Sequence, residues 1–393
     1  MVTIKTQTSP RNAARYFNEH LSRDDYYSDK QHTPGRWFGH GCQLVGLESG
    51  SIARQDDFVA LCKGLRPDNH AKLTQRMKAN RRCLNDVTIS APKSLSVMAV
   101  TMADERLITA HEKAVAATME AAERLASARV RKGAAVDTRE SRVTGNVVCA
   151  QFLHRESRAL DPQLHTHCIT FNVTHDPVEN RFKALEARPL YDNARKLTAI
   201  YREHLTQSLH ALGYETYHDR FQCVQIRGVD AAIMRQFSKR SAQRDTWVQL
   251  KQQELGRSLT NDEVAQVVRE HRARKQKGLS AEALRKAQLQ QLSEDSRLKL
   301  AQVKQRALDI CAGVAPRREM PQRQPQPYVP GPWIATIRLA MLAARTVNAD
   351  PYLFSPNRSF EDRVLWTVRH LQQVQRAKAI VRQMQRGQRG ISR

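Results

Sequence analysis

The amino-acid sequence predicts an α+β fold. Runs with the two-residue alternation of strands occur at 85–90, 145–154 and 165–174, and apolar residues recur at helical spacing over 105–130 and 196–212. The two kinds of element do not alternate regularly along the chain, which disfavours a doubly wound parallel sheet. We therefore expect an α+β sandwich, in which helices pack against a sheet.

The first hundred residues predict a helix, a loop and a strand, in that order. Ser9 and Pro10 are residue types that cap and open a helix, and this helix would place Tyr16 near one face with other aromatic residues. Pro34 and three glycines then predict a loop over 22–41. The strand at 85–90 runs into a sharp polar stop, SAPKS.

The middle of the chain predicts two long amphipathic helices with two strands between them. The apolar stripe of the helix at 105–130 includes His111, and the stripe of the helix at 196–212 is expected to end at Gly213. Further on, Thr260 and Glu263 have the spacing of a capping box.

The C-terminal third has a different composition. From about 247 to 312 the chain is rich in Gln, Arg, Lys and Glu, which suggests exposed helices with less core. A Pro/Gln/Arg linker is expected at 313–335 and a basic helical tail at 336–393. From Arg363 to Arg393 the tail has eight arginines or lysines and no acidic residue, which fits a nucleic-acid or partner arm or, equally, a solvated basic helix.

Charge is the strongest global signal. The chain has 64 Lys and Arg against 39 Asp and Glu in 393 residues, a net charge of +25. A polyanion would relieve the self-repulsion, so nucleic acid is the first candidate partner and an anionic membrane the second. No apolar run approaches the ~20 residues of a membrane span, and the N-terminus lacks the apolar core of a signal peptide. Seven cysteines without CxxC spacing indicate a reduced, cytoplasmic protein.

Three of the 14 histidines lie in one window, HRESRALDPQLHTHCITFN, at His154, His165 and His167. Alternation puts His165 and His167 on one strand face, and a ten-residue connection with a turn at Asp161-Pro162 would return the preceding strand so that His154 joins them. Three imidazoles can hold a divalent metal with open positions, whereas Cys168 would point to the opposite face. The alternative is a set of polar histidines capping a hairpin.

An open metal in a basic protein suggests phosphodiester chemistry, which needs a nucleophile. The chain has neither a GxSxG motif nor a GxxxxGK[ST] phosphate loop. Tyr16, Tyr26 and Tyr27 are candidates, because a metal and a proton acceptor can activate a hydroxyl whose unperturbed pKa is about 10. Alternatively, these aromatic rings pack on the core.

These residues resemble a known family. The histidine motif, the tyrosines of ARYF and DDYY, and the segment NDVTISAPKSLSV are similar to those of MobF-type (TrwC/TraI-like) conjugative relaxases of the HUH endonuclease superfamily. GRWFGHGCQLVGL and QFSKRS are weaker matches. The resemblance runs from about residue 10 to 300, in the order that the family uses. The first aromatic pair is Tyr16-Phe17 where the family often has two tyrosines, and the gap to Tyr26 is two residues longer than expected.

The resemblance implies a central antiparallel β-sheet flanked by helices and a mostly helical fingers region that closes over DNA. The implied division is a relaxase catalytic domain at 1–235 and fingers at 236–312, followed by the linker and the tail. It implies a metal site at the three histidines, with Mg²⁺ or Mn²⁺ expected and Zn²⁺ or Ni²⁺ as alternatives. By motif, Tyr16 would nick, Tyr26 with Tyr27 would act in the second strand transfer, and Asp86 would orient a ligand histidine or help to deprotonate the tyrosine.

The implied activity is site- and strand-specific DNA nicking at a plasmid transfer origin, which leaves a 5′-phosphotyrosyl link and a free 3′-OH. Partners would be single-stranded DNA, accessory relaxosome proteins, a separate helicase and a type IV secretion coupling protein. The protein would be cytoplasmic in a bacterium and exported to the recipient on the DNA. Two alternatives are a rolling-circle replication initiator with the same chemistry and a non-catalytic DNA-binding protein with a structural metal.

Phosphate-binding candidates flank the predicted site residues. They are basic residues near Asp86 and in the FSKR stretch, and each could equally be a general surface charge. The candidates are Arg81, Arg82, Lys93, Lys239 and Arg240.

Overall fold

The computed structural model describes residues 1–8, 34–74, 81–130, 140–271 and 280–317. All of them lie in one compact unit, Met1–Arg318. Tyr16, Tyr26 and Tyr27, the helix expected from Ser9, and most of the predicted linker and tail lie outside the described residues.

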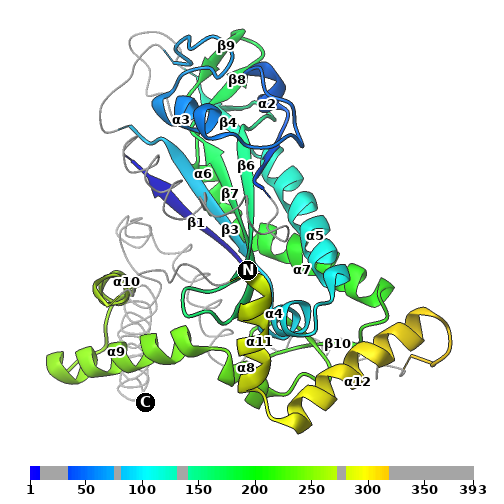
Figure 1. Ribbon diagram of the computed structural model, residues 1–393. Coiled ribbons are helices and arrows are strands. Elements are labelled where there is room, and N and C mark those ends of the chain that lie inside the picture. The colour runs from blue at the N-terminus through cyan, green and yellow to red at the C-terminus, as the bar shows by residue number, and fades with distance from the viewer. Residues whose placement is uncertain (9–33, 75–80, 131–139, 272–279, 318–393) are drawn as a thin grey trace, which may run out of the picture. The chain divides into compact units, whose positions relative to one another are not determined.

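A five-stranded antiparallel sheet forms the centre of this unit (Figure 1). Its strands, in spatial order, are β1 (Val2–Gln7), β3 (Leu84–Ser90), β7 (Pro162–Phe171), β6 (Cys149–Glu156) and β2 (Arg36–Phe38). All four pairings are antiparallel. The predicted α+β class and the central antiparallel sheet are therefore confirmed.

Helices cover one face of the sheet. The main core joins β3 and β7 to α4 (Lys93–Thr101), α5 (Glu105–Glu123) and α7 (Ala194–Ala211). Both predicted amphipathic helices are present, and Gly213 follows α7 with a φ of +83°. An added Cβ at Gly213 would lie 2.0 Å from a backbone oxygen of α12 (Glu294–Cys311), so glycine is required there.

The opposite face has a smaller core at one end. There Trp37, Phe58, Phe152 and Phe171 pack together, with Phe58 and Phe171 edge to face at 5.0 Å. Helices α2 (Gly41–Leu44) and α3 (Gln55–Lys63) contribute side chains to this smaller core. The prediction of a loop over 22–41 is wrong at its end, because 36–38 form the edge strand β2. The burial of Trp37 stabilises this strand and outweighs the tendency of the flanking glycines to form a loop.

The C-terminal part of the unit is helical. It contains α8 (Ala231–Gln236), α9 (Lys239–Leu255), α10 (Asn261–Glu270), α11 (Ala281–Gln291) and α12. The capping box of Thr260 and Glu263 is present at α10, and α9 has no buried residue, as the composition predicts. Leu300 and Ala307 of α12 belong to the main core, however. The division at 235/236 stays a prediction.

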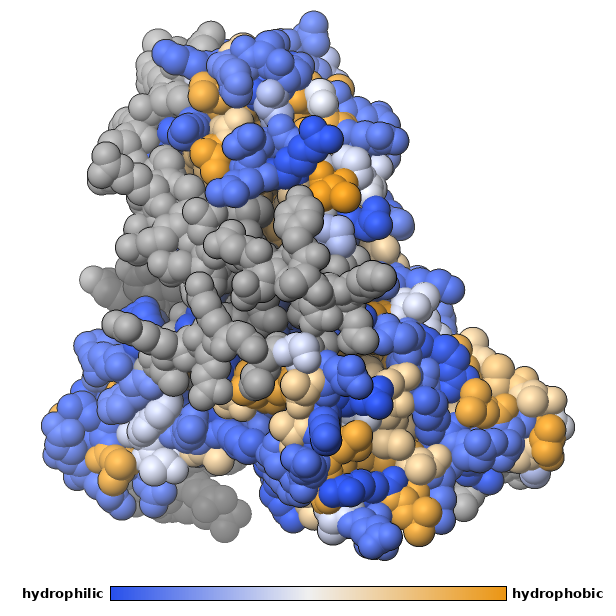
Figure 2. Space-filling view, viewed as in Figure 1, coloured by the Kyte–Doolittle hydropathy of each residue, from blue (hydrophilic) through white to orange (hydrophobic). Residues whose placement is uncertain are grey.

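Short elements complete the described chain. The strands are β4 (Ser127–Arg129), β5 (Ser141–Val143), β8 (Thr174–Asp176), β9 (Arg181–Lys183), β10 (Thr216–His218) and β11 (Val224–Ile226), and the helix is α6 (Arg188–Asp192). Figure 2 shows a face dominated by hydrophilic side chains with scattered apolar ones. Among the described residues, no helix is both long enough and apolar enough to cross a membrane.

Candidate metal centre and active site

The three histidines of the sequence motif share one face of the sheet. The β6–β7 register places His154 opposite His165, and Phe152 opposite His167. The ring centroids of His154 lie 5.3 Å from those of both other histidines, and the centroids of His165 and His167 are 5.1 Å apart. Cys168 points to the opposite face and is fully buried in the main core. The antiparallel hairpin thus brings together the residues that alternation singled out.

Hydrogen bonds at Nδ1 set the orientation of two of the three imidazole rings, those of His165 and His167. The Nδ1 of His167 lies 2.9 and 3.0 Å from the two carboxylate oxygens of Asp86, on the neighbouring strand β3. The Nδ1 of His165 lies 2.8 Å from the backbone oxygen of Gln163. Because a carboxylate and a carbonyl accept, each Nδ1 carries the proton, and each Nε2 keeps a lone pair for an ion.

The donor set fits a first-row divalent metal. Imidazoles that bind one ion at ~2.1 Å through nitrogen have ring centroids roughly 5 Å apart, close to the separations found here. In the described part of the chain, no three His, Cys, Asp or Glu side chains are already arranged around a common ion position. The three side chains would therefore have to move before they could share an ion.

Thr88 was not singled out from the sequence, but it belongs to this site. Its hydroxyl donates to Asp86 Oδ1 at 3.0 Å and lies 3.2 Å from Nδ1 of His167. Thr88 follows Asp86 by two residues on β3, so both side chains face the histidines. Strand alternation around Asp86 could have indicated it.

A buried network supports β7 from behind. Thr166, between the two histidines of β7, faces the helices, and its hydroxyl lies 3.0 Å from Nε2 of His111 on α5. The Nδ1 of His111 lies 2.7 Å from the hydroxyl of Tyr201 on α7. Burial lowers the pKa of His111 to about 3 and raises the pKa of Tyr201. The His111 imidazole is therefore neutral, and it links β7 to both helices.

A family model described as TrwC relaxase matches residues 10–294. The chain belongs to the TrwC relaxase family. This confirms the resemblance to MobF-type relaxases that the motifs indicated.

Relatives of known sequence and structure agree with this membership. The "Multifunctional conjugation protein TraI" of Escherichia coli (strain K12) is 37% identical over 226 residues, which are 55% of this chain and 12% of that protein. The chain therefore spans about an eighth of the length of this curated relative. A metal-bound complex of conjugative relaxase TrwC with oriT DNA aligns at a TM-score of 0.62 and 28% identity, over 79% of this chain and 98% of that one. A copper-bound complex aligns at 0.64 and 29%, over 77% and 99%.

The basic residues predicted to contact DNA are in different environments in this TrwC-family chain. Arg82 and Arg240 are exposed. Arg81 donates to the backbone oxygen of Cys62 at 2.8 Å, and Lys239 donates to the side chain of Gln291. Lys93 is largely buried and donates to the backbone oxygen of Pro162 and the side chain of Gln163, at 2.9 and 3.0 Å. Burial lowers its pKa to about 8. These hydrogen bonds of Lys93 fix the first residues of β7, including Gln163, whose backbone oxygen accepts from Nδ1 of His165.

The tyrosines of this family member lie in the segment 9–33, outside the described residues. The residues that flank this segment belong to the two opposite edges of the sheet, β1 and β2. Gly35 lies against the ring of Phe152, which is on the histidine face two residues from His154. Gly35, the second described residue after the segment, therefore lies on the histidine face of the sheet.

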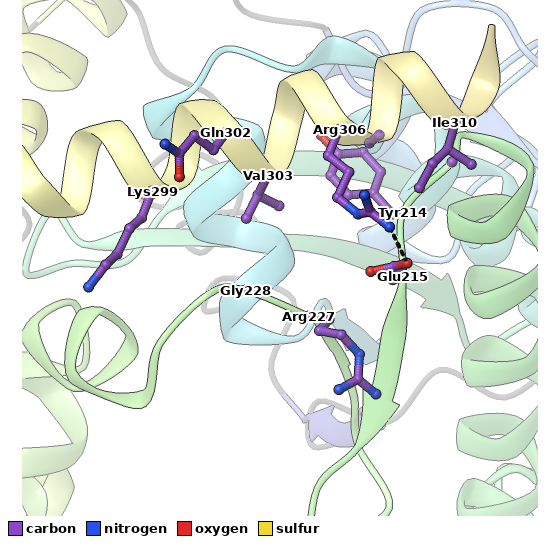
Figure 3. A pocket seen from close by; sticks show the side chains of 11 residues that line it. Tyr214, Glu215, Arg227, Gly228, Lys299, Gln302, Val303, Arg306 and Ile310 are labelled. Atoms are coloured by element: carbon purple, nitrogen blue, oxygen red, sulfur yellow. Dashed lines mark hydrogen bonds and ion pairs between the residues drawn. The ribbon is translucent and has the colours of Figure 1, made fainter. Parts of the chain in front are cut away.

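A separate cavity of about 240 Å³ lies between α12 and the β10–β11 ribbon (Figure 3). Arg227, Lys299 and Arg306 contribute cationic groups to its wall. Arg306 pairs with Glu215 at 3.1 Å, and Lys299 pairs with Asp295 at 2.8 Å. Because acids offset most of this charge, and because none of the three histidines lines it, the cavity is not an extension of the histidine site.

Proposed function

We propose that the chain nicks one DNA strand at a plasmid transfer origin by metal-assisted tyrosine transesterification. The observation that carries the proposal is the set of three histidines on one sheet face, two of them with Nδ1 hydrogen-bonded to an acceptor, which leaves Nε2 as the unprotonated nitrogen. Membership of the TrwC relaxase family and the likeness to TrwC complexes with oriT DNA support it.

The proposed reaction exchanges one phosphodiester for another. The tyrosine hydroxyl loses its proton and attacks phosphorus, a Tyr Oη–P bond forms, and the P–O3′ bond breaks. The departing oxygen takes up a proton to become the free 3′-OH, while the 5′-phosphate stays on the tyrosine. Because the number of phosphodiester bonds is unchanged, the strand can be rejoined without ATP.

The three histidines are the proposed metal ligands. A divalent ion bound there would act as a Lewis acid on a phosphate oxygen. Asp86 and Thr88 hold the tautomer of His167, which keeps its Nε2 available. We propose Mg²⁺ or Mn²⁺ as the ion, with Zn²⁺ or Ni²⁺, which imidazole ligands suit, as alternatives.

We propose Tyr16 as the nicking nucleophile, with Tyr26, assisted by its neighbour Tyr27, in the second strand transfer. The contact of Gly35, which lies two residues beyond 9–33, with Phe152 on the histidine face supports a nucleophile from this segment. We further propose that 1–235 forms the catalytic domain and that 236–312 forms fingers that close over the DNA, with 313–335 as a linker and 336–393 as a basic tail.

The proposed partners follow from this role. They are single-stranded DNA of the transfer origin, accessory relaxosome proteins, a helicase supplied by another chain, and a type IV secretion coupling protein. We propose that the protein works in the bacterial cytoplasm and reaches the recipient covalently bound to the DNA.

The test is cleavage of a single-stranded oligonucleotide that carries the cognate transfer origin, in the presence of Mg²⁺ or Mn²⁺. The expected product is a covalent protein–DNA adduct, and mass spectrometry of the bound peptide should identify Tyr16. An adduct that survives the double substitution Tyr16→Phe and Tyr26→Phe would overturn the tyrosine roles. Absence of any adduct from the wild-type chain would overturn the proposed activity.

A further inference from the structure

The turn between β10 and β11 is built rigidly around one carboxylate. Asp219 Oδ1 accepts from the backbone N–H groups of Phe221 and Cys223, at 2.8 and 2.9 Å. The backbone of Asp219 also bonds Cys223 and Gln222, and Gln222 has a φ of +58°. These bonds fix the direction in which the turn presents the side chain of Phe221.

That side chain faces solvent. Phe221 is 67% exposed, more than any other Phe, Tyr or Trp in the described part of the chain. The guanidinium of Arg220 lies 4.7 Å from its ring centroid. Arg202, whose guanidinium lies 3.1 Å from Cys223 Sγ, adds a second cation. The turn thus combines two guanidinium groups with an exposed aromatic ring. The carboxylate of Asp219 accepts hydrogen bonds within the turn itself.

The strand that follows the turn is connected to the start of β7 by a series of side-chain contacts. Gln225 of β11 accepts from the hydroxyl of Ser94 at 2.7 Å, at the start of α4. The preceding residue, Lys93, contacts Gln163, whose backbone oxygen holds Nδ1 of His165. These contacts connect β11, which packs in the main core, to the first residues of β7, close to His165 in the sequence.

We propose that Phe221 is a stacking platform for a base of single-stranded DNA, with Arg220 beside it to contact the phosphate backbone. An exposed aromatic ring next to a cation is the arrangement by which proteins bind unpaired bases without reading their sequence. A rigid turn lowers the entropy lost when the base stacks. The occupant is a nucleic acid because the chain carries a net charge of +25. This inference rests on the proposed function in one respect, because the DNA strand that stacks on Phe221 is the strand that the protein nicks.

The test is binding of an oligodeoxythymidine, which does not pair with itself, by the full chain over a series of salt concentrations. Phe221→Ala should weaken binding by about 5- to 10-fold. The slope of log K against log salt should stay the same, because no charge is lost. Arg220→Gln should instead reduce that slope by about 0.7. Val178→Ala, at a side chain that is 70% exposed on another turn, is the matched control and should bind as wild type does.

A second variant keeps the proposal testable if Phe221→Ala folds poorly. Phe221→Trp should retain affinity, and its tryptophan emission should be quenched by the oligonucleotide beyond the change in the wild type, which has four tryptophans. Wild-type affinity in Phe221→Ala, or no added quenching in Phe221→Trp, would overturn the stacking role. Either result could occur while the wild type still forms its tyrosine adduct, so the two proposals fail separately.

Discussion

Acid should destabilise this protein through His111. Its imidazole is completely buried between α5, β7 and α7, and burial lowers its pKa from 6.5 to about 3. Below pH 6.5 the unfolded chain takes up a proton at this residue and the folded chain does not. Stability is therefore fully present above pH 6.5 and falls by about 1.4 kcal/mol for each pH unit between 6.5 and about 3. From pH 7 to pH 5, this one group should cost about 2 kcal/mol.

The assay is urea denaturation of the wild type and of His111→Gln at both pH values. Glutamine stays neutral and can still bond the hydroxyls of Thr166 and Tyr201, so its variant should lose about 2 kcal/mol less than the wild type over this range. Other titrating groups are common to both proteins and cancel in the difference. If the two proteins lose the same stability within about 0.5 kcal/mol, His111 is not held neutral by the fold and the reasoning is refuted.

Three further predictions concern the metal, the core and the DNA. Asp86→Ala should lower Mn²⁺ affinity by about 10- to 100-fold in calorimetry, because it removes the hydrogen-bond acceptor from Nδ1 of His167, a proposed metal ligand, and an unchanged affinity would exclude that role. Gly213→Ala should lower the unfolding free energy by well over ~1 kcal/mol, because its Cβ meets a backbone oxygen at 2.0 Å, whereas Gly145→Ala, with open space around it, should cost less. Arg82→Gln and Arg240→Gln should each reduce the salt slope of single-stranded DNA binding by about 0.7, and an unchanged slope would show that the replaced residue contacts no phosphate.

The histidine face could be predicted from the sequence because alternation holds for any strand. His154, His165 and His167 share a face, and Cys168 takes the other, whatever the rest of the fold does. The length of the connection could not be predicted. The sequence predicts a link of ten residues, but both strands extend into it and leave only 157–161 between them. The pairing of the two strands shifts in register after His154. Pairing of the backbones extends both strands in this region, although its polar side chains are typical of a loop.

The supports of the site could not be predicted, because they come from distant parts of the chain. His111 occupied one position in a helical stripe, and only the fold shows that its partners are Thr166 and Tyr201, 55 and 90 residues away. Lys93 was expected to bind phosphate from its charge and its closeness to Asp86. Its contacts with Pro162 and Gln163, 69 and 70 residues away, depend on how α4 meets β7.

These supports hold the histidine-bearing strand in place through contacts of the protein itself. β7 pairs with β3 on one side and β6 on the other, Thr166 fixes it from behind, and Lys93 holds its first residues. With the backbone of β7 held in this way, the three imidazoles are the groups that would move to bind a metal. Removal of the metal by a chelator should therefore abolish adduct formation and lower the unfolding free energy only by the binding term, about 2.7 kcal/mol for an ion present at 100 times its dissociation constant. Loss of the folded state on chelation, seen by circular dichroism, would instead show that the ion holds the sheet together.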